Sequence, residues 1–264
     1  MIRLADELSV SEVERFGINI MTARIGGLVI AYGAYGGLEN LYFYRQTDGG
    51  GRVLAIVAVF CGHATVAAGD DADFGELSEF LKVVSVEVTA FPEVTDRLGF
   101  DEAGTVEVLE YRGISVSGTA LGGAVDFPRT DDVYRILKAG EDGDILLPDR
   151  ESFCADLSHR MRHGAAVAKV TPSAAAVCGF MTDCFALITG VSVLPGSRGT
   201  GEGRRVLSLL IDALTPRRVF VTASGNVSSF YKKCGFQSAG TAVTVSTSRP
   251  VTADGMGRTG PAGR

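Results

Sequence analysis

The chain of 264 residues contains no tryptophan and has few residues of the kinds that bind metals or form disulfides. Its three histidines, His63, His159 and His163, are too few and too widely spaced to predict a metal-dependent enzyme. The five cysteines are odd in number and form no CxxC pair, which argues against a disulfide framework and a zinc site. We therefore expect no bound metal and a reducing, cytoplasmic location.

Long apolar runs and an excess of positive charge are also missing. No apolar run reaches the roughly 18 residues that indicate a membrane span, and residues 1–17 lack the apolar segment of a signal peptide. The formal net charge is -6, which argues against sequence-independent nucleic-acid binding. Hydrophobic residues make up 46%, which indicates a globular protein, and we expect neither a membrane nor a nucleic-acid partner.

The first part of the chain is expected to mix helices and strands. Residues 20–35 are apolar enough for a buried helix or strand. Asp73 and Glu76 have the spacing of a capping box, and the apolar residues behind Asp73 share one helical face. Strand-like runs separated by glycine-rich turns are expected at 40–45, 53–60, 64–68, 84–89 and 105–111.

The second part of the chain is expected to begin near residue 114 and to contain helices, hairpins and a glycine-rich loop. Helices are expected from Thr130 to Gly140, at 153–161, from Leu207 until Pro216 closes the helix, and after a capping Asn226. Strands are expected at 165–170, 174–181, 186–194, 218–222 and 242–246, the first three as antiparallel hairpins. Residues 248–264 have no apolar face, and we expect a disordered tail there.

The glycine-rich loop is VLPGSRGTGEGRR, residues 193–205. Glycine has no side chain to block the backbone, so such a loop can bring N–H groups close to a phosphate. A Walker A loop is disfavoured because Glu202, and not lysine, follows the correctly spaced Gly196 and Gly201. A Rossmann loop is disfavoured because Arg204 occupies the third glycine position and the preceding strands look antiparallel.

The pattern R-x-x-G-x-G does fit, with Arg198, Gly201 and Gly203. Here the sequence resembles the GNAT superfamily of N-acetyltransferases. The stretch ALITGVSVLPGSRGTGEGRRVLSLLIDAL is similar to the acetyl-CoA motif of that superfamily, and NVSSFYKKCGF is similar to the strand–helix motif that follows it. The resemblance is specific over 186–236 and extends over 115–247 by the order of elements. Gly196, Ser197 and Glu202 depart from the usual residues of the loop, but none of them removes a required amide.

The resemblance implies an α/β (α+β) protein with the GNAT acyl-CoA N-acyltransferase fold, in which helices flank a mixed, mostly antiparallel sheet. We expect an N-terminal α/β domain at 1–113, a GNAT domain at 114–247 and the tail at 248–264. The first third carries no second copy of R-x-x-G-x-G, and it is interpreted as a degenerate GNAT-like half. Such two-part acetyltransferases hold the cofactor only in the C-terminal half.

The resemblance also implies where coenzyme A binds. Main-chain groups of the strand before the loop would pair with the pantetheine arm, and the loop amides would bind the pyrophosphate at the helix N-terminus. The amide of Val191 would also polarise the thioester carbonyl. Arg198 and Arg204 would add charge, and Asn226 would cap its helix or contact the cofactor. The expected cofactor-binding residues are Val191, Ser192, Val193, Arg198, Gly199, Thr200, Gly201, Glu202, Gly203, Arg204 and Asn226.

Tyr231 is the expected catalytic residue, because a phenol stays protonated at neutral pH and the departing thiolate needs a proton. The general base is left open between His159, His163, Asp183, backbone carbonyls and water. We expect transfer of an acetyl group from acetyl-CoA to a primary amine of an unidentified acceptor. A non-catalytic acyl-CoA-binding module is the alternative, and a nucleoside triphosphatase is disfavoured by Glu202. Whether the protein is a homodimer stays open.

Overall fold

The computed structural model describes residues 1–34, 40–113, 128–140 and 147–247. The strands of this part of the chain form one sheet, in the order β1-β2-β3-β4-β5-β11-β6-β10-β9-β8-β7. Their bounds are β1 Ile2–Leu4, β2 Leu41–Thr47, β3 Val53–Phe60, β4 His63–Ala68, β5 Glu87–Ala90, β6 Asp101–Tyr111, β7 Val167–Val170, β8 Ala174–Met181, β9 Phe185–Val193, β10 Arg218–Ala223 and β11 Phe236–Ser246. Helices flank this mixed, mostly antiparallel sheet, which confirms the predicted fold class.

The two halves of the sheet repeat one pattern. In the first half β2, β3 and β4 are antiparallel, and β5 is parallel to β4. In the second half β7, β8 and β9 are antiparallel, and β10 is parallel to β9. A helix connects each parallel pair, α3 (Phe74–Val84) in the first half and α7 (Glu202–Leu214) in the second. Parallel neighbours need such a crossover connection.

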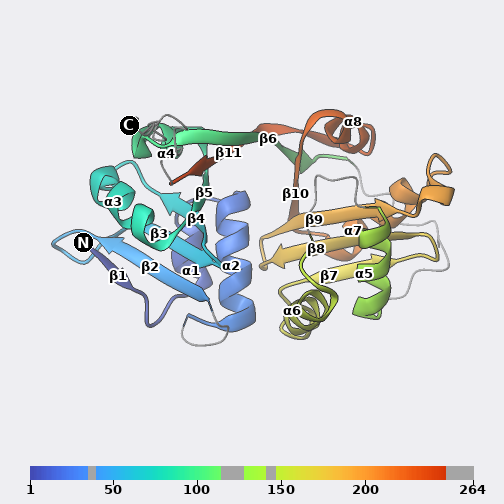
Figure 1. Ribbon diagram of the computed structural model, residues 1–264, viewed down its shortest axis with the longest axis horizontal. Coiled ribbons are helices and arrows are strands. Elements are labelled where there is room, and N and C mark those ends of the chain that lie inside the picture. The colour runs from blue at the N-terminus through green and yellow to red at the C-terminus, as the bar shows by residue number, and fades with distance from the viewer. Residues whose placement is uncertain (35–39, 114–127, 141–146, 248–264) are drawn as a thin grey trace, which may run out of the picture.

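The last strand of each half pairs with the other half. β6 follows the first half in sequence but lies against β10, and β11 ends the second half but lies against β5. The two strands also pair with each other, from Tyr111 opposite Phe236 to Asp101 opposite Ser246. Figure 1 shows β6 and β11 along the top, where they join the halves. The expected domain boundary at 113/114 therefore divides the sequence into two parts, but it does not divide the sheet, which is continuous across both halves.

Helix α2 (Ile20–Tyr32) packs the first half against the second. It lies in the middle of Figure 1, between the strands of the two halves, and nearly all of its residues are buried. A Cβ at Gly26 would lie 2.9 Å from a Thr182 methyl group, and one at Gly27 would lie 3.0 Å from the Phe180 Cα. These glycines let the helix backbone rest directly on β8. A helix buried almost all round has to lie between two packed layers.

Replacing Gly27 with alanine is expected to lower the free energy of unfolding by about 1–3 kcal/mol, the usual cost of overpacking a core. Backbone atoms of β8 meet the new methyl group, and backbone cannot rotate away as a side chain would. Gly75→Ala in α3 is the matched control, because its methyl group would meet only the Asp73 carboxylate, at 3.4 Å. Urea unfolding should show a loss for Gly27→Ala and no loss for Gly75→Ala, because alanine favours helix. Equal effects would contradict this packing.

The remaining helices are α1 Val10–Glu14, α4 Pro92–Leu98, α5 Thr130–Ala139, α6 Arg150–Arg162 and α8 Gly225–Lys233. Among them, α5, α6 and α8 were predicted, whereas α1 and α4, like strand β1, were not. Three details differ from the expectations. Ser224, not Asn226, is the N-cap of α8. Strand β5 begins only at Glu87, because residues up to Val84 continue α3. The predicted tail at 248–264 lies outside the described residues.

The capping box expected at Asp73 is formed only in part. The Asp73 side chain accepts a hydrogen bond from the Glu76 amide, as predicted. The Glu76 carboxylate instead bonds the Ile2 amide and the Gln46 side chain, and the Gln46 amide oxygen accepts from the Asp73 backbone N–H. A tertiary contact thus replaces the second half of the local motif.

Candidate functional site

An open strand edge lies where β9 and β10 part. Their parallel ladder ends at the pair Ile188–Val221, although β9 continues to Val193 and β10 to Ala223. On its other side β9 remains paired with β8 as far as Val193. The main chain of residues 190–193 therefore has no strand partner on one edge within the described sheet. The three predicted strand residues, Val191, Ser192 and Val193, all lie on this edge.

A glycine turn leads from this edge into α7. The chain passes through a 3-10 turn at Pro195–Ser197, and Gly199 and Gly201 then adopt φ values of +78° and +93°. Residues with a side chain rarely adopt this backbone. Gly201 is the N-cap of α7, and no side chain caps the first-turn amides of the helix. The turn therefore presents the positive end of a helix whose first amides are not capped by a side chain, which is an anion-binding arrangement.

Close packing explains why glycine occupies position 203, and the sequence alone did not reveal this. A Cβ there would lie 3.2 Å from the Val193 side chain and 3.5 Å from the Phe230 ring. Glycine at this position lets α7 approach the end of β9 and α8 closely. The open strand edge and the glycine turn are thereby held next to each other.

Glu202 lies in the turn, but its carboxylate is bonded to the β7–β8 connection. It accepts hydrogen bonds from the hydroxyls of Thr171 (2.9 Å) and Ser173 (3.2 Å) and pairs with Arg205 (3.3 Å). These contacts, that with Thr171 first, lower the pKa of Glu202. The negative charge is therefore neutralised by Arg205 and shared with two hydroxyls. The acid that disfavours a Walker A loop fastens the turn to the sheet.

Glu202→Gln is expected to lower the free energy of unfolding at pH 7 by about 1–2 kcal/mol, the range for charged hydrogen bonds that keep some solvent contact. Because folding lowers the pKa of Glu202 below its ordinary 4.5, this contribution is complete above that pH and is lost as the pH falls through the folded-state value. Wild type and variant should therefore converge in acid. Glu7→Gln, at an exposed position outside the helices, is the control and should match wild type throughout. A constant gap at all pH values would contradict this role.

The predicted basic and hydroxyl groups of the turn all lie on the surface. Arg198 is exposed and its Nε approaches the Val193 carbonyl at 3.5 Å. The Thr200 hydroxyl donates to the Ser197 carbonyl at 2.7 Å. Arg204 donates to the Lys233 carbonyl at 3.1 Å, at the end of α8. Arg204 thus caps α8, and only its remaining donors are available to an anion.

Tyr231 lies in the core beside this turn. It is 5% exposed and makes edge-to-face contacts with Phe230 and Phe236, at centroid distances of 5.2 and 5.4 Å. Its core cluster also contains Ile188 and Val221, the last paired residues of β9 and β10. Burial raises the pKa of Tyr231 above its ordinary value. The phenol therefore stays protonated at neutral pH, and its hydroxyl has no hydrogen-bond partner among the described residues.

The candidate bases do not lie at the strand edge. His159, on α6, bonds the Ala31 carbonyl (2.7 Å), stacks on Tyr32 and touches the His163 ring. This places both histidines beside the C-terminal end of α2. Asp183 lies in the turn before β9, at the opposite end of that strand from Val193. Of the other predicted contacts, Asn226 belongs to the first turn of α8, and its side chain is not described.

Comparison with known proteins identifies the fold. No family model matches the sequence, and a search of curated proteins found no match. Solved structures do match. A tandem GNAT protein from the clavulanic acid biosynthesis pathway is 11% identical, with a TM-score of 0.57 over 94% of this chain and 99% of that one. A GCN5-related N-acetyltransferase from Kribbella flavida is 14% identical, with a TM-score of 0.56 over 92% and 96%. This chain has the two-part GNAT fold.

A yeast structure has a similar fold. N-myristoyltransferase from Saccharomyces cerevisiae, solved with myristoyl-CoA, is 9% identical, with a TM-score of 0.54 over 92% of this chain and 79% of that one. At these identities the likeness concerns the fold. None of the described helices of this chain has both the length and the apolar character of a membrane span. All five of its cysteines are free.

The first half of this GNAT fold lacks the glycine turn. Where β9 leads to α7 in the second half, β4 leads to α3 through Gly69, Asp70, Asp71 and Asp73. Asp73 caps the first turn of α3 with its own carboxylate, and three acids would repel a phosphate. Among the described residues, the uncapped helix N-terminus that suits a phosphate is therefore found at α7 and not at α3.

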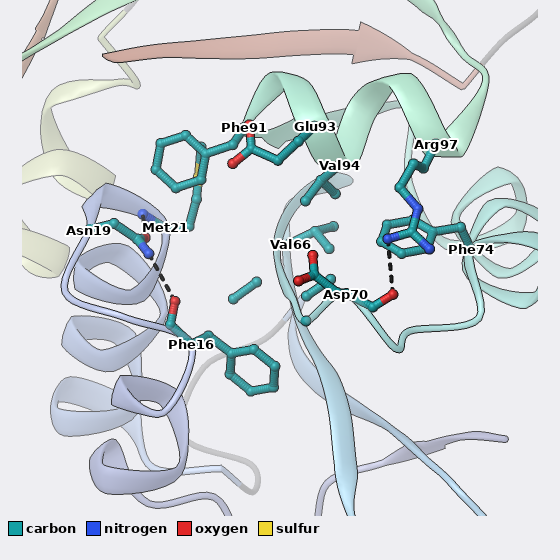
Figure 2. Close-up of a pocket in the computed structure, with 13 residues that line it drawn as sticks. Phe16, Asn19, Met21, Val66, Asp70, Phe74, Phe91, Glu93, Val94 and Arg97 are labelled. Carbon is teal, nitrogen blue, oxygen red and sulfur yellow. Dashed lines mark hydrogen bonds between the residues drawn. The ribbon is translucent and has the colours of Figure 1, made fainter. Parts of the chain in front are cut away.

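A cavity lies at the corresponding place of the first half, between α2, β4 and α4. Figure 2 shows this cavity of ≈ 240 Å³, with Arg97 stacked over Phe74 at 3.7 Å. Arg97 also donates a hydrogen bond to the Asp70 carbonyl at 3.0 Å. The arginine of this cleft is therefore bound to its own loop.

The structure contains a second cavity that the sequence did not predict. It lies where β9 and β10 part, has a volume of ≈ 250 Å³, and includes Arg24 of α2 and Thr189 and Thr222 of the two strands. The available signal was Arg24 itself, a charged residue inside the apolar stretch IMTARIGGLVIAY. Only the fold brings it beside strands more than 150 residues later in the chain.

Proposed function

We propose that this protein is an acyltransferase that uses acyl-CoA, and more narrowly an N-acetyltransferase that moves an acetyl group from acetyl-CoA to a primary amine. The observation that carries the proposal is the unpaired edge of β9 continuing into the uncapped, glycine-built N-terminus of α7. An extended amide-containing arm fits the edge, and a pyrophosphate fits the helix end. The fold shared with GNAT structures supports the same cofactor class.

The proposed reaction is direct transfer. The amine nitrogen attacks the thioester carbonyl carbon, the C–S bond breaks, and the products are an amide and coenzyme A. The Val191 amide would stabilise the carbonyl oxygen as it becomes negative. Tyr231 would give its proton to the departing sulfur. The attacking amine would release a proton to solvent, and Tyr231 would take one back from solvent. The phenol is protonated throughout the neutral range, which is the state that a proton donor needs before the reaction.

The cofactor contacts divide into main-chain and side-chain groups. Main-chain groups of Val191, Ser192 and Val193 would pair with the pantetheine arm. The Ser192 side chain would not take part, because its hydroxyl already donates a hydrogen bond to the Ile136 carbonyl at 3.1 Å. The first-turn amides would bind the pyrophosphate, through residues Gly199, Thr200, Gly201, Glu202, Gly203 and Arg204. Arg198 and the free donors of Arg204 would add positive charge. The chemistry needs no metal.

The proposed domain organisation assigns different tasks to the halves. The half formed by residues 114–247 would hold coenzyme A, and the half formed by residues 1–113 would shape the acceptor site through α2. Free thiols at all five cysteines suit a reducing cytoplasm.

Calorimetry and a thiol-release assay test the proposal together. Calorimetry of the full chain should show binding of acetyl-CoA and coenzyme A. With acetyl-CoA and a panel of primary amines, free thiol should appear and the acetylated amine should be detectable by mass spectrometry. Binding without thiol release would identify a non-catalytic acyl-CoA-binding module instead. Absence of coenzyme A binding by folded protein would refute the proposal.

A further inference from the structure

The cavity at the parting of β9 and β10 is built from both halves. Its walls are formed by α2, by β5, β6 and β11, and by β8, β9 and β10, and its volume is ≈ 250 Å³. Ile188 and Thr189 lie on its β9 side and Thr222 on its β10 side. Ile188 is the last residue of β9 paired with β10, so the cavity begins where the strand edge opens. A small molecule in it would lie about two residues, or ~7 Å of strand, from Val191.

Arg24 is the only charged residue among the described residues that line this cavity. In the described part of the chain, no carboxylate or carbonyl bonds or pairs with it. Its guanidinium carbon lies 5.6 Å from the centre of the Phe180 ring. Burial and the nearby charge of Arg160 lower the pKa of Arg24, which nevertheless stays charged, as arginine does in proteins.

The carboxylate of Asp156, which lies beside Arg160, already has partners within the protein. Asp156 pairs with Arg160 on the same helix, at 2.7 Å, and the Tyr32 hydroxyl also donates to it. Arg160 is thereby satisfied, and Arg24 is left facing the cavity. Arg24 is half-buried and lines the cavity, so its guanidinium donors are available to an anion bound there.

Hydroxyl groups supply the remaining polarity of the walls. Thr189 and Thr222 are exposed to the cavity mouth, and Thr89 and Thr244 bond each other across β5 and β11 at 3.2 Å. Neither Asp nor Glu is present among the described lining residues, so nothing there would attract a second ammonium group or repel an anion. The walls combine one fixed cation, neutral hydroxyls and apolar side chains.

We propose that this cavity is the acceptor pocket and that the acceptor is a small primary amine bearing a carboxylate, held by Arg24 in a two-pronged contact. The planar guanidinium matches a carboxylate in this way. The carboxylate lies at α2, and the amine points towards the open edge of β9. The acyl-transfer step rests on the proposed function, whereas recognition of the carboxylate does not.

Binding without cofactor tests the recognition by itself. Amino acids are compared by calorimetry with their decarboxylated counterparts, such as alanine with ethylamine and ornithine with putrescine. A carboxylate bonded to Arg24 should tighten binding by about tenfold or more. Arg24→Met, of similar length in an apolar helix, should abolish the difference between the pair members, and Arg24→Lys should keep part of it. Arg15→Met, at an exposed position, is the control and should behave as wild type.

Three outcomes overturn the inference. Equal binding of both pair members by wild type would show that no cation recognises the carboxylate, and a preference that survives in Arg24→Met would place it elsewhere. An aminophosphonate bound better than the amino acid would show that the anion recognised is not a carboxylate. If amino acids bind through Arg24 but yield no thiol with acetyl-CoA, the pocket stands and the proposed function fails.

Discussion

Tyr231→Phe should lower the rate of thiol release from acetyl-CoA by about 10²–10⁴-fold, the usual contribution of a general acid. The loss should appear in kcat, with the Kd for coenzyme A unchanged, because the departing thiolate needs the proton only during the reaction. The fold should persist, since the ring remains packed against Phe230 and Phe236 and the lost hydroxyl has no partner among the described residues. Steady-state kinetics and calorimetry on the same preparation measure both quantities.

Tyr111→Phe is the matched control for this prediction. Tyr111 packs edge-to-face on the same Phe236, at 5.3 Å, and burial raises its pKa as well. The two variants therefore lose the same atom beside the same ring. Similar rates for Tyr231→Phe and wild type would remove Tyr231 from the mechanism. A comparable loss in both variants would show an effect on packing.

Gly201→Val should weaken coenzyme A binding by about tenfold or more. Gly201 has φ +93° at the N-cap of α7, where a β-branched residue is strained by at least ~1–2 kcal/mol. Relief of that strain would turn the first-turn amides away from the pyrophosphate. Calorimetric titration with coenzyme A, and with dephospho-coenzyme A to isolate the pyrophosphate, measures the effect.

Gly196→Val controls for adding bulk to the same turn. A Cβ at Gly196 meets nothing within 4 Å, and Gly196 is not among the residues with positive φ. We expect its Kd to lie within about twofold of wild type. Equal weakening by both variants would indicate simple obstruction of the surface, and unchanged binding by Gly201→Val would refute the pyrophosphate site.

Residue types close together in the sequence predicted the strand, turn and helix around the glycine loop. The contacts that hold this loop in place depend on the tertiary structure. The glycine-rich loop was predicted from its residue types, and the structure adds that Gly199 and Gly201 adopt positive φ, a conformation that glycine adopts readily. The contacts of Glu202 with Thr171 and Ser173 were not predictable, because they join residues about 30 positions apart. The N-cap of α8 was misplaced by two residues, since both Ser224 and Asn226 are of residue types that cap helices.

The sequence by itself determined most of the strands and helices, the glycine turn before α7 and the motif order that resembles GNAT acetyltransferases, because these depend on residues close together in the chain. Only the tertiary structure decided that β6 and β11 exchange between the halves and that α2 carries Arg24 to the parting of β9 and β10. Strand pairing and the burial of a charge depend on groups distant in sequence, and their energies exist only once the sheet has formed.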